Sequence, residues 1–529
     1  MTISPASKQK LQTVECGHAQ PDAPFPMNQD AIAAVAAAER LDVSESEYLI
    51  SCACAKGATR QQLPGIIRQA RTRLDRIREE TSNILATPLP DRELTDFVTR
   101  ASEALQAGPA FAPDTADRFF GGALALCSRV ESVSAEINAS IAGVQAEVAA
   151  LRQDHRWAAE LFARAAAKPG LSETVQWRLQ FQRAAVLDEL GREYGDDGAL
   201  EQAVELYQDA VLPLAPRSER PNDWSVTQHY LGNALGILGQ RGRGIRHLER
   251  SVAAFENALS DRHRDHHPLD WAASQHGLGN ALGILAQRQG DSDLMERAVS
   301  CLQAAVEVRG RQAASAEWAQ SAYHLGAALL VLGQVTRDAS ALSRSIDAFH
   351  QALQVLTWER EPLDWAKCQN SLGMALRVRG EQDQQGETGD LNNAVEAYQR
   401  ALKIWTQEQW PEEWALTQNN LGAALQRLGE RENSVDYLGV AAAAYENALQ
   451  QLSRDNKPLV WAMTRANLGD VRQSLGELTR NSETAEKAVA DFELVAAIFH
   501  DASHARYYEL AKEQLAAARE LAAELSVAR

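Results

Sequence analysis

Apolar residues recur along most of this chain in a stripe with a fixed internal spacing. The stripe begins at a tryptophan, continues with a leucine seven positions later, and reaches a second leucine after four more, as in Trp414, Leu421 and Leu425. Steps of seven and four place these side chains on one face of an α-helix. The tryptophans lie 47 residues apart, and once 49 apart, at Trp177, Trp224, Trp271, Trp318, Trp365, Trp414 and Trp461. This constant interval predicts tandem repeats.

A glycine follows the first leucine of the stripe in six repeats, at Gly232, Gly279, Gly326, Gly373, Gly422 and Gly469. Glycine inside a helix costs about 1 kcal/mol relative to alanine, so its recurrence predicts that a second helix approaches closely there. That helix is predicted about 31 residues after each tryptophan, where small residues flank a bulky one, as in Ala441, Tyr445 and Ala448. Each repeat is therefore predicted to be a helical hairpin.

The start of most first helices is marked by proline. A proline lies three residues before five of the tryptophans, at Pro221, Pro268, Pro362, Pro411 and Pro458. Proline lacks the N–H that the first turn of a helix leaves without a partner, and its fixed φ suits that position. We therefore expect the first helix of each of these repeats to begin there.

A polar tail and a smaller helical region are predicted ahead of the repeats. Residues 1–29 are polar and rich in proline, glutamine and aspartate, and we expect them to be disordered. Short helices are predicted over 31–41 and 46–54. A longer helix is predicted from Leu63, because apolar residues then recur at steps of four and three as far as Ile84. This stripe is a candidate surface for a homodimer through the N-terminal helices.

Arginines are concentrated on the outer face of that longer helix, at Arg60, Arg68, Arg71, Arg73, Arg76 and Arg78. Three interpretations remain open. The arginines form a solvated face, they pair with acidic residues elsewhere in the chain, or they bind an acidic partner.

The Leu-Gly pair of the first stripe and the small/bulky/small pattern of the second resemble the tetratricopeptide repeat. The resemblance covers roughly residues 130–529. The standard repeat has 34 residues, whereas this one adds a turn before Leu-Gly and a longer connection. It is similar to the long repeats of kinesin light chains and of bacterial regulatory proteins. The resemblance implies an all-α fold in which helical hairpins form a right-handed superhelix.

These patterns divide the chain into four segments. We predict a disordered tail over residues 1–29 and a helical N-terminal region over 30–125. A repeat array follows over 126–503, with about seven repeats of 47 residues and one degenerate repeat ahead of them. A capping helix over 504–529 is predicted to end the array, because one of its faces is charged where it meets water.

Composition and charge exclude several functions. The formal net charge of −18 opposes nonspecific attraction to nucleic acid or to anionic membranes. Six cysteines without regular spacing do not form a disulfide framework. No apolar run is long enough for export or for a membrane span. We therefore expect a cytoplasmic protein, with binding to nucleic acid and to membranes both disfavoured.

No motif indicates catalysis. Residues 277–283 imitate a glycine-rich dinucleotide loop, but they lie inside a predicted helix and follow no strand. Histidines at 263, 266 and 267 lack a recognised ligand spacing, as do the cysteines at 16, 52 and 54 with the histidine at 18. We therefore predict a protein that is not an enzyme and that has no metal, no cofactor and no catalytic residue.

The remaining candidate site is the side of the first helices turned away from the second helices. The fifth, ninth and twelfth residues after each tryptophan are predicted to lie there. From these positions we select His229, Asn233, His276, Asn280, Tyr323, Asn370, Arg377, Asn419 and Gln426. Amides donate and accept hydrogen bonds, which suits the backbone of an extended peptide. The resemblance implies the same role, since the kinesin light chain type holds peptides partly through first-helix asparagines.

Two functions follow from this reading. The first is a protein-interaction scaffold or adaptor that binds a peptide segment of an unidentified partner in the concave groove. The second is a regulator whose N-terminal helices bind DNA or dimerise while the repeats sense a partner or peptide. Residues 37–49 resemble the helical half of ribbon-helix-helix DNA-binding proteins, although no basic strand precedes them.

Overall fold

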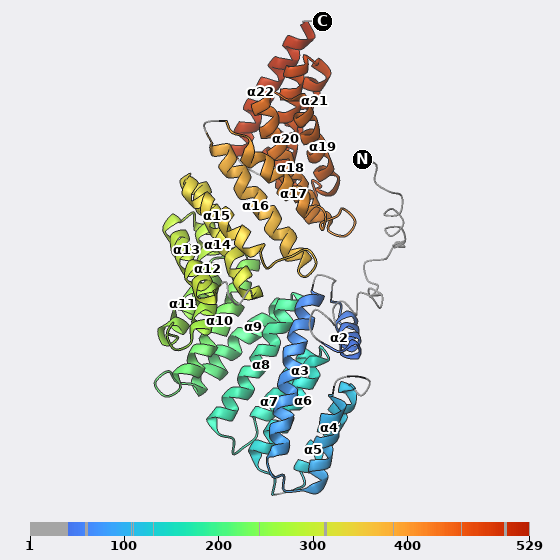
Figure 1. Ribbon diagram of the computed structural model, residues 1–529, viewed down its shortest axis with the longest axis vertical. Helices are drawn as coiled ribbons and strands as arrows, with labels where there is room; N and C mark the ends of the chain where they lie inside the picture. Colours follow the sequence, from blue (N-terminus) through green and yellow to red (C-terminus); the bar gives the residue numbers. More distant parts are fainter. Residues whose placement is uncertain are drawn as a thin grey trace. The chain divides into compact units, whose positions relative to one another are not determined.

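The computed structural model is built from α-helices that follow one another as antiparallel hairpins (Figure 1). It describes residues 41–58, 62–106, 108, 111–130, 132–242, 244–310, 315–383, 386–455, 457–501 and 505–527. Within these ranges the chain forms 21 α-helices and no β-strand, which confirms the predicted all-α fold. The chain divides into two compact units, which we call unit 1 (residues 1–241) and unit 2 (residues 242–529).

Unit 1 contains the predicted N-terminal region and the first repeats. Its α-helices are α2 (Val43–Ala55), α3 (Leu63–Ala86), α4 (Arg92–Ala104), α5 (Pro113–Cys127), α6 (Ala135–Leu151), α7 (His155–Ala166), α8 (Glu173–Tyr194), α9 (Asp197–Leu206) and α10 (Pro221–Arg241). A π-helical turn, η2 (Tyr207–Val211), and a 3₁₀ turn, η3 (Leu212–Leu214), follow α9.

The N-terminal predictions have mixed outcomes. The tail over 1–29 lies outside the described residues, as does all but the last residue of the helix predicted over 31–41. The helix predicted over 46–54 is α2, which begins three residues earlier, at Val43. It begins there because the Asp42 side chain accepts a hydrogen bond from the Ser44 N–H, and the Glu45 side chain accepts one from the Asp42 N–H.

The core of unit 1 joins the apolar faces of helices α2 to α6, and several of its side chains are fully buried: Leu49, Leu74, Ile77, Val98, Phe120 and Ile141. The stripe along α3 belongs to this core and packs against α6. It is therefore not an exposed surface for a second copy of the chain, because helices of the same chain already cover it.

Unit 2 contains most of the repeat array. Its helices are α11 (Arg246–Asp261), α12 (Pro268–Gln289), α13 (Ser292–Arg309), α14 (Ala316–Thr336), α15 (Ala339–Ala352), α16 (Pro362–Gln382), α17 (Gly389–Ala401), α18 (Pro411–Glu432), α19 (Val435–Gln451), α20 (Pro458–Thr479), α21 (Ser482–Asp501) and α22 (Ala505–Val527). Even-numbered helices from α12 to α20 are the first helices of their repeats. The helices α12, α16, α18 and α20 each begin at the proline that lies three residues before the tryptophan of the repeat, as predicted.

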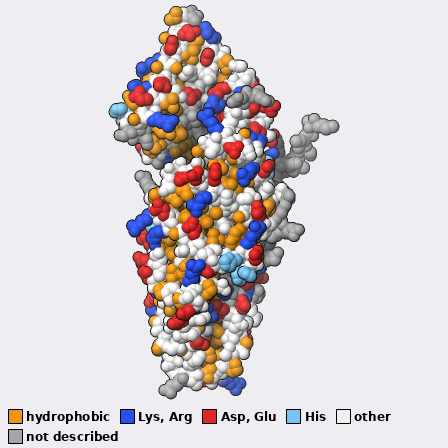
Figure 2. Space-filling model, turned by 90° about the vertical axis from the view of Figure 1, so that its left-hand side faces the viewer, with side chains coloured by type: hydrophobic (Ala, Val, Ile, Leu, Met, Phe, Trp, Pro, Cys, Tyr) orange, Lys and Arg blue, Asp and Glu red, His pale blue; other side chains and the backbone are white. Residues whose placement is uncertain are grey.

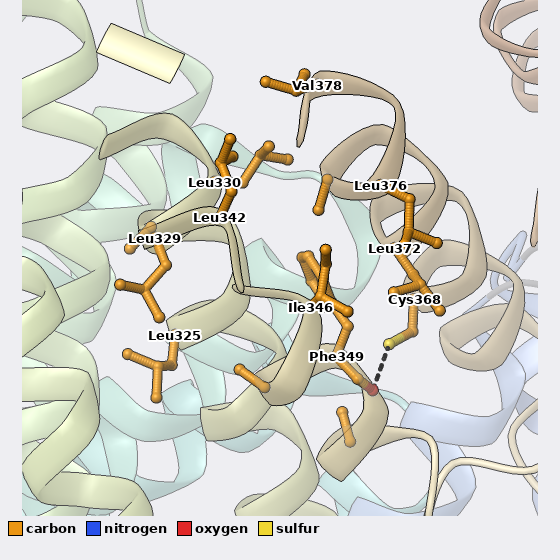
Figure 3. Packing of buried hydrophobic residues seen from close by; sticks show 14 of the residues in the cluster. Leu325, Leu329, Leu330, Leu342, Ile346, Phe349, Cys368, Leu372, Leu376 and Val378 are labelled. Atoms are coloured by element: carbon orange, nitrogen blue, oxygen red, sulfur yellow. Dashed lines mark hydrogen bonds between the residues drawn. The ribbon is translucent and has the colours of Figure 1, made fainter. Parts of the chain in front are cut away.

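The apolar core of unit 2 runs without interruption from one repeat to the next. Figure 3 shows one junction, where Leu325 of α14, Phe349 of α15 and Leu372 of α16 face a shared interior. The Cys368 thiol donates a hydrogen bond to the Phe349 carbonyl oxygen over 3.6 Å. Burial raises the pKa of Cys368 well above its usual range, so this thiol stays protonated and acts as a packing residue.

None of the helices in the described ranges combines the length and the apolar character that crossing a membrane requires. On the face shown in Figure 2, acidic and basic side chains are interspersed with apolar ones. The negative charge of the chain is therefore not gathered into one acidic patch on that face.

Candidate partner-binding face

The glycines of the repeat lie where each second helix crosses its first helix. A Cβ atom added at Gly422 would come within 2.9 Å of the Tyr445 ring, and one added at Gly279 would come within 2.7 Å of Leu302. Equally close approaches occur at Gly326, Gly373 and Gly469. Real Cβ atoms essentially never approach other atoms within 3.0 Å. The glycine side of each first helix is thus filled by its second helix. Gly232, on α10 of unit 1, is also buried.

We call the opposite side of these first helices the free face, and in unit 2 it belongs to α12, α14, α16, α18 and α20. Five of the predicted site residues lie there and are half-buried: His276, Asn280, Tyr323, Asn370 and Asn419. Tyr323 also packs against the apolar core, with its ring centroid 5.8 Å from that of Phe349 on α15.

Two of these asparagines bond to the next first helix along the chain. The Asn420 side chain on α18 donates to Asn370 Oδ1 on α16 over 3.2 Å, and Asn467 on α20 donates to Asn419 Oδ1 over 3.5 Å. A side-chain amide has two donor hydrogens and two acceptor lone pairs, so one bond leaves capacity for a ligand. The asparagines therefore connect neighbouring repeats and keep further hydrogen-bonding capacity.

The N-terminal part of the free face is aromatic. The Tyr323 hydroxyl lies 3.4 Å from Ser371 Oγ, and the Lys367 ammonium lies 4.9 Å from the centroid of the Tyr323 ring. The rings of His276 and His324 meet edge to face, with centroids 5.1 Å apart. Burial, together with the nearby Lys367 charge, lowers the pKa of His324 to about 4. His324 is therefore neutral at physiological pH, and Lys367 supplies the positive charge here.

Charged side chains are concentrated toward the C-terminal ends of α16 and α18. We call the residues Arg377, Glu381, Arg427 and Glu430 the charged row. Arg377 pairs with Glu381 at 2.5 Å, Arg427 pairs with Glu430 at 2.7 Å, and Arg427 also lies 3.6 Å from Glu381. The Arg427 side chain is 51% exposed, so it remains accessible to a partner. Sequence reasoning selected only Arg377, although arginine and glutamate spaced by three or four residues indicate such ion pairs.

Gln426 does not lie on the free face as predicted. It is 8% exposed, the Tyr445 hydroxyl donates to its Oε1 over 3.0 Å, and its Nε2 donates to Glu430 over 2.8 Å. The reason is helical geometry, because the twelfth position lies one turn after the glycine and so points toward the second helix. Arg377 shares this position, and its side chain is only 20% exposed.

The two predicted site residues of unit 1 lie together on α10. His229 Nε2 is 3.2 Å from Asn233 Nδ2, and the His229 ring meets Tyr230 edge to face with centroids 5.6 Å apart. Phe181 of α8 lies edge to face with Tyr230 at 5.0 Å. Aromatic rings therefore lie beside the His229 imidazole.

The arginines of α3 pair mainly within the chain. Arg73 is buried between Glu147 of α6 and Glu189 of α8, and the Arg76 guanidinium lies 2.9 Å from Glu147. Burial alone would raise the pKa of Glu189, but the Arg73 guanidinium, aided by His155, lowers it to about 2. Arg73 is therefore buried and does not lie on an outer face as predicted. Of the three interpretations, pairing with acidic residues of the chain holds for Arg73, Arg76 and Arg78. Arg60 lies outside the described residues.

The half-buried carboxylate of Asp470 on α20 lies near the Glu430 charge. Gln514 of α22 donates to its Oδ1 over 2.9 Å. Burial, followed by the Glu430 charge, raises the pKa of Asp470 to about 6, while Arg427 and the Gln514 hydrogen bond act in the opposite direction. Tyr445 of α19 also interacts electrostatically with this carboxylate. The Asp470 charge therefore changes in the physiological pH range.

Replacing Asp470 with asparagine is expected to stabilise unit 2 at pH 8 by about 2 kcal/mol. The folded-state pKa is raised, so this carboxyl favours folding while protonated and loses that contribution as the pH rises through about 6. Asp470→Asn should therefore change stability little at pH 4. Urea unfolding at pH 4, 6 and 8 measures this, with Asp347→Asn at an exposed position of α15 as the control. Equal effects of the two variants at pH 8 would contradict the prediction.

No group of three or more histidine, cysteine, aspartate and glutamate side chains within the described ranges is arranged to hold a metal ion. The free face presents amides and aromatic rings, and the charged row adds ion pairs. Amides form hydrogen bonds, aromatic rings stack, and charged side chains form ion pairs, which are the interactions used in peptide recognition.

Comparison with protein families gives a match for one hairpin. Residues 414–455 match the family model described as tetratricopeptide repeat. This segment comprises most of α18 and all of α19, and the same glycine and small/bulky/small pattern recurs in the other hairpins. This hairpin of the chain is therefore similar to the tetratricopeptide repeat. No curated protein sequence matches it.

Solved structures similar to this chain include three helical-repeat proteins. The C-terminal part of a TPR repeat-containing protein from Cytophaga hutchinsonii has 12% identity and a TM-score of 0.38, covering 60% of this chain and 95% of that one. A Podospora anserina kinesin light chain protein with TPR-like repeats has 21% identity and a TM-score of 0.29, covering 41% and 93%. A Rap protein complexed with Competence and Sporulation Factor has 12% identity and a TM-score of 0.35, covering 84% and 99%.

Proposed function

We propose that this protein is an interaction scaffold that holds a peptide segment of a partner protein on the free face of unit 2. The observation that carries the proposal is the pair of asparagines, Asn370 and Asn419, on adjacent first helices. Both are half-buried, each is held by a bond to the next repeat, and each retains hydrogen-bonding capacity. Side chains fixed in this way lose little entropy when they bind a ligand.

The chemistry of the free face suits a segment with a polar backbone and mixed charge. The asparagines bind peptide N–H and C=O groups whatever the side chains of the partner are. Tyr323 and Lys367 offer stacking and one positive charge, and the charged row near the C-terminal ends of α16 and α18 offers exchangeable ion pairs. Partly exposed ion pairs are worth little to stability, so a partner can replace one member at low cost.

This scaffold role requires neither catalysis nor a cofactor, and a cytoplasmic location belongs to the same hypothesis. The alternative of a DNA-binding or dimerising regulator has less support from the residues. Leu49 and Ile50 of α2 lie in the core of unit 1, and Glu45 of α2 pairs with Arg78 of α3. These helices use their apolar and charged groups inside the chain.

Changing Asn370 and Asn419 together to alanine is expected to weaken partner binding roughly 10- to 100-fold, because each lost hydrogen bond is worth about 1 kcal/mol. The test captures partners from a native extract with the full-length chain, and then measures the affinity of a purified partner for both forms. The matched control changes two exposed residues of the second helix α17, Asn393→Ala with Gln399→Ala. Circular dichroism melts confirm that both variants are folded. Equal affinities of the two variants would place the site elsewhere.

A further inference from the structure

Unit 1 contains a pocket that is separate from the free face of unit 2. Its volume is ≈ 320 Å³, and it lies where the end of α2, the start of α7 and the end of α8 meet. Pockets that bind small molecules have volumes from about 300 Å³ upward. The pocket is therefore large enough for a ligand of amino-acid size.

Two ion pairs line the pocket. Lys56, which follows α2, pairs with Asp154 at 2.5 Å, and Arg156 of α7 pairs with Asp196 at 2.6 Å. All four side chains are partly exposed, by 30–61% of their surface. Such pairs contribute little to stability, so their members are available to a ligand. The four charges cancel, which favours a ligand that itself carries one charge of each sign.

The remaining walls are aromatic and apolar. Trp157 is 41% exposed, and Leu190 and Tyr194 of α8 belong to the same pocket lining. The Tyr194 hydroxyl donates to Gln153 Oε1 over 2.8 Å. Gln153 is 5% exposed and has a left-handed φ of 63°, a conformation that costs a residue other than glycine about 1 kcal/mol or more. The packing around the pocket therefore holds a strained, buried amide in its lining.

We propose that this pocket binds a small zwitterion, a molecule with one carboxylate, one ammonium group and an aromatic or branched aliphatic side chain. Its carboxylate pairs with Lys56 and Arg156, and its ammonium group pairs with Asp154 and Asp196. Its side chain packs against Trp157. When the zwitterion replaces partners in the two ion pairs, every charge in the pocket remains paired. A ligand with only a negative or only a positive charge would leave charges in this pocket without a partner.

The test uses the full-length protein with L-phenylalanine as the probe. At about 10 mM, L-phenylalanine is expected to raise the first unfolding midpoint by about 2 °C or more, in a saturable manner. N-acetyl-L-phenylalanine and L-phenylalaninamide each lack one charge and should give less than a third of that shift. L-leucine should behave as L-phenylalanine does.

Two variants at exposed positions locate the effect. Trp157→Ala is expected to abolish the shift, and Lys56→Gln to weaken the apparent affinity at least tenfold. Lys487→Gln on α21, an exposed lysine paired with Glu483, serves as the control and should leave the shift unchanged. The proposal is overturned if neither zwitterion shifts the midpoint, if the singly charged analogues act equally well, or if the shift survives Trp157→Ala.

Discussion

Replacing Arg73 with alanine is expected to destabilise unit 1 by about 3–5 kcal/mol, which is the usual cost of removing one partner from a buried ion pair. Arg73 has 7% of its side chain exposed and contacts Glu147 and Glu189, whose side chains are 1% and 10% exposed. The variant leaves both carboxylates buried. Arg76 still contacts Glu147, and His155 lies 3.4 Å from Glu189, so neither carboxylate is entirely without a partner.

Amide hydrogen exchange along α3 and α8, followed by mass spectrometry, measures this loss locally. A local readout is needed because repeat arrays do not unfold in a single two-state step. The control is Arg100→Ala, since Arg100 and its partner Asp96 are both more than half exposed, and such a pair is worth at most about 1 kcal/mol. Similar exchange in the two variants would show that Arg73 does not hold α3 in place.

A double variant distinguishes the effect of an unpaired buried charge from the effect of lost packing. Arg73→Met together with Glu189→Gln removes the charges of this pair and keeps similar volume. This double variant should recover most of the stability that Arg73→Ala loses, because buried ion pairs are often replaced by neutral groups at little cost. A double variant as unstable as Arg73→Ala would indicate that the geometry of the pair, and not the unpaired charge, dominates.

The buried position of Arg73 shows where the sequence alone is insufficient. On a helical wheel the arginines of α3 form one polar face, and a polar face is usually solvated. Glu147 and Glu189 lie 74 and 116 residues further along the chain. Only the tertiary packing of α6 and α8 brings them to α3. No local pattern in the sequence indicates that Arg73 pairs with Glu147 and Glu189, so this pairing is found only in the structure.

The hairpins were predictable because their signal is local and repeated. Each first helix needs a leucine stripe and a small residue at one position, and both are read directly from spacing. The free face was predicted less well at its twelfth position. Helical spacing counted from the tryptophan places Gln426 away from the second helix, whereas its distance of four residues from Gly422 places it on nearly the same side as that glycine. Helical spacing counted from the glycine therefore identifies Gln426 as a packing residue.

The charged row shows a different limit. Arg427 and Glu430 form an ion pair within α18, which spacing indicates, but Arg427 also approaches Glu381 of the preceding first helix. The offset between α16 and α18 along their helix axes determines whether Arg427 can reach Glu381. The insertion that lengthens one repeat to 49 residues lies between Trp365 and Trp414, in the connection that precedes α17. The sequence predicts such an insertion but not how the helices on each side of it are aligned.

Replacing Gly422 with leucine is expected to destabilise the α18–α19 hairpin by more than about 3 kcal/mol, the upper end of the usual cost of inserting extra carbon into a packed interface. A Cβ atom at this position would already lie 2.9 Å from the Tyr445 ring, and the three further carbons of leucine have no space. Tyr445 cannot move away freely, because its hydroxyl donates to Gln426. Gly422→Leu should therefore separate the two helices.

The measurement compares thermal unfolding of Gly422→Leu with that of Gln399→Leu, in which the same side chain is placed on the exposed face of α17. Gln399→Leu should change stability by less than about 0.5 kcal/mol, as surface substitutions usually do. A double-mutant cycle with Tyr445→Ala then identifies the contact directly. If the leucine clashes with the tyrosine ring, its cost should fall by at least about 1 kcal/mol once the ring is removed, since residues in contact are coupled to this extent. Additive costs, or equal melting temperatures of Gly422→Leu and Gln399→Leu, would mean that the second helix does not require glycine at this crossing.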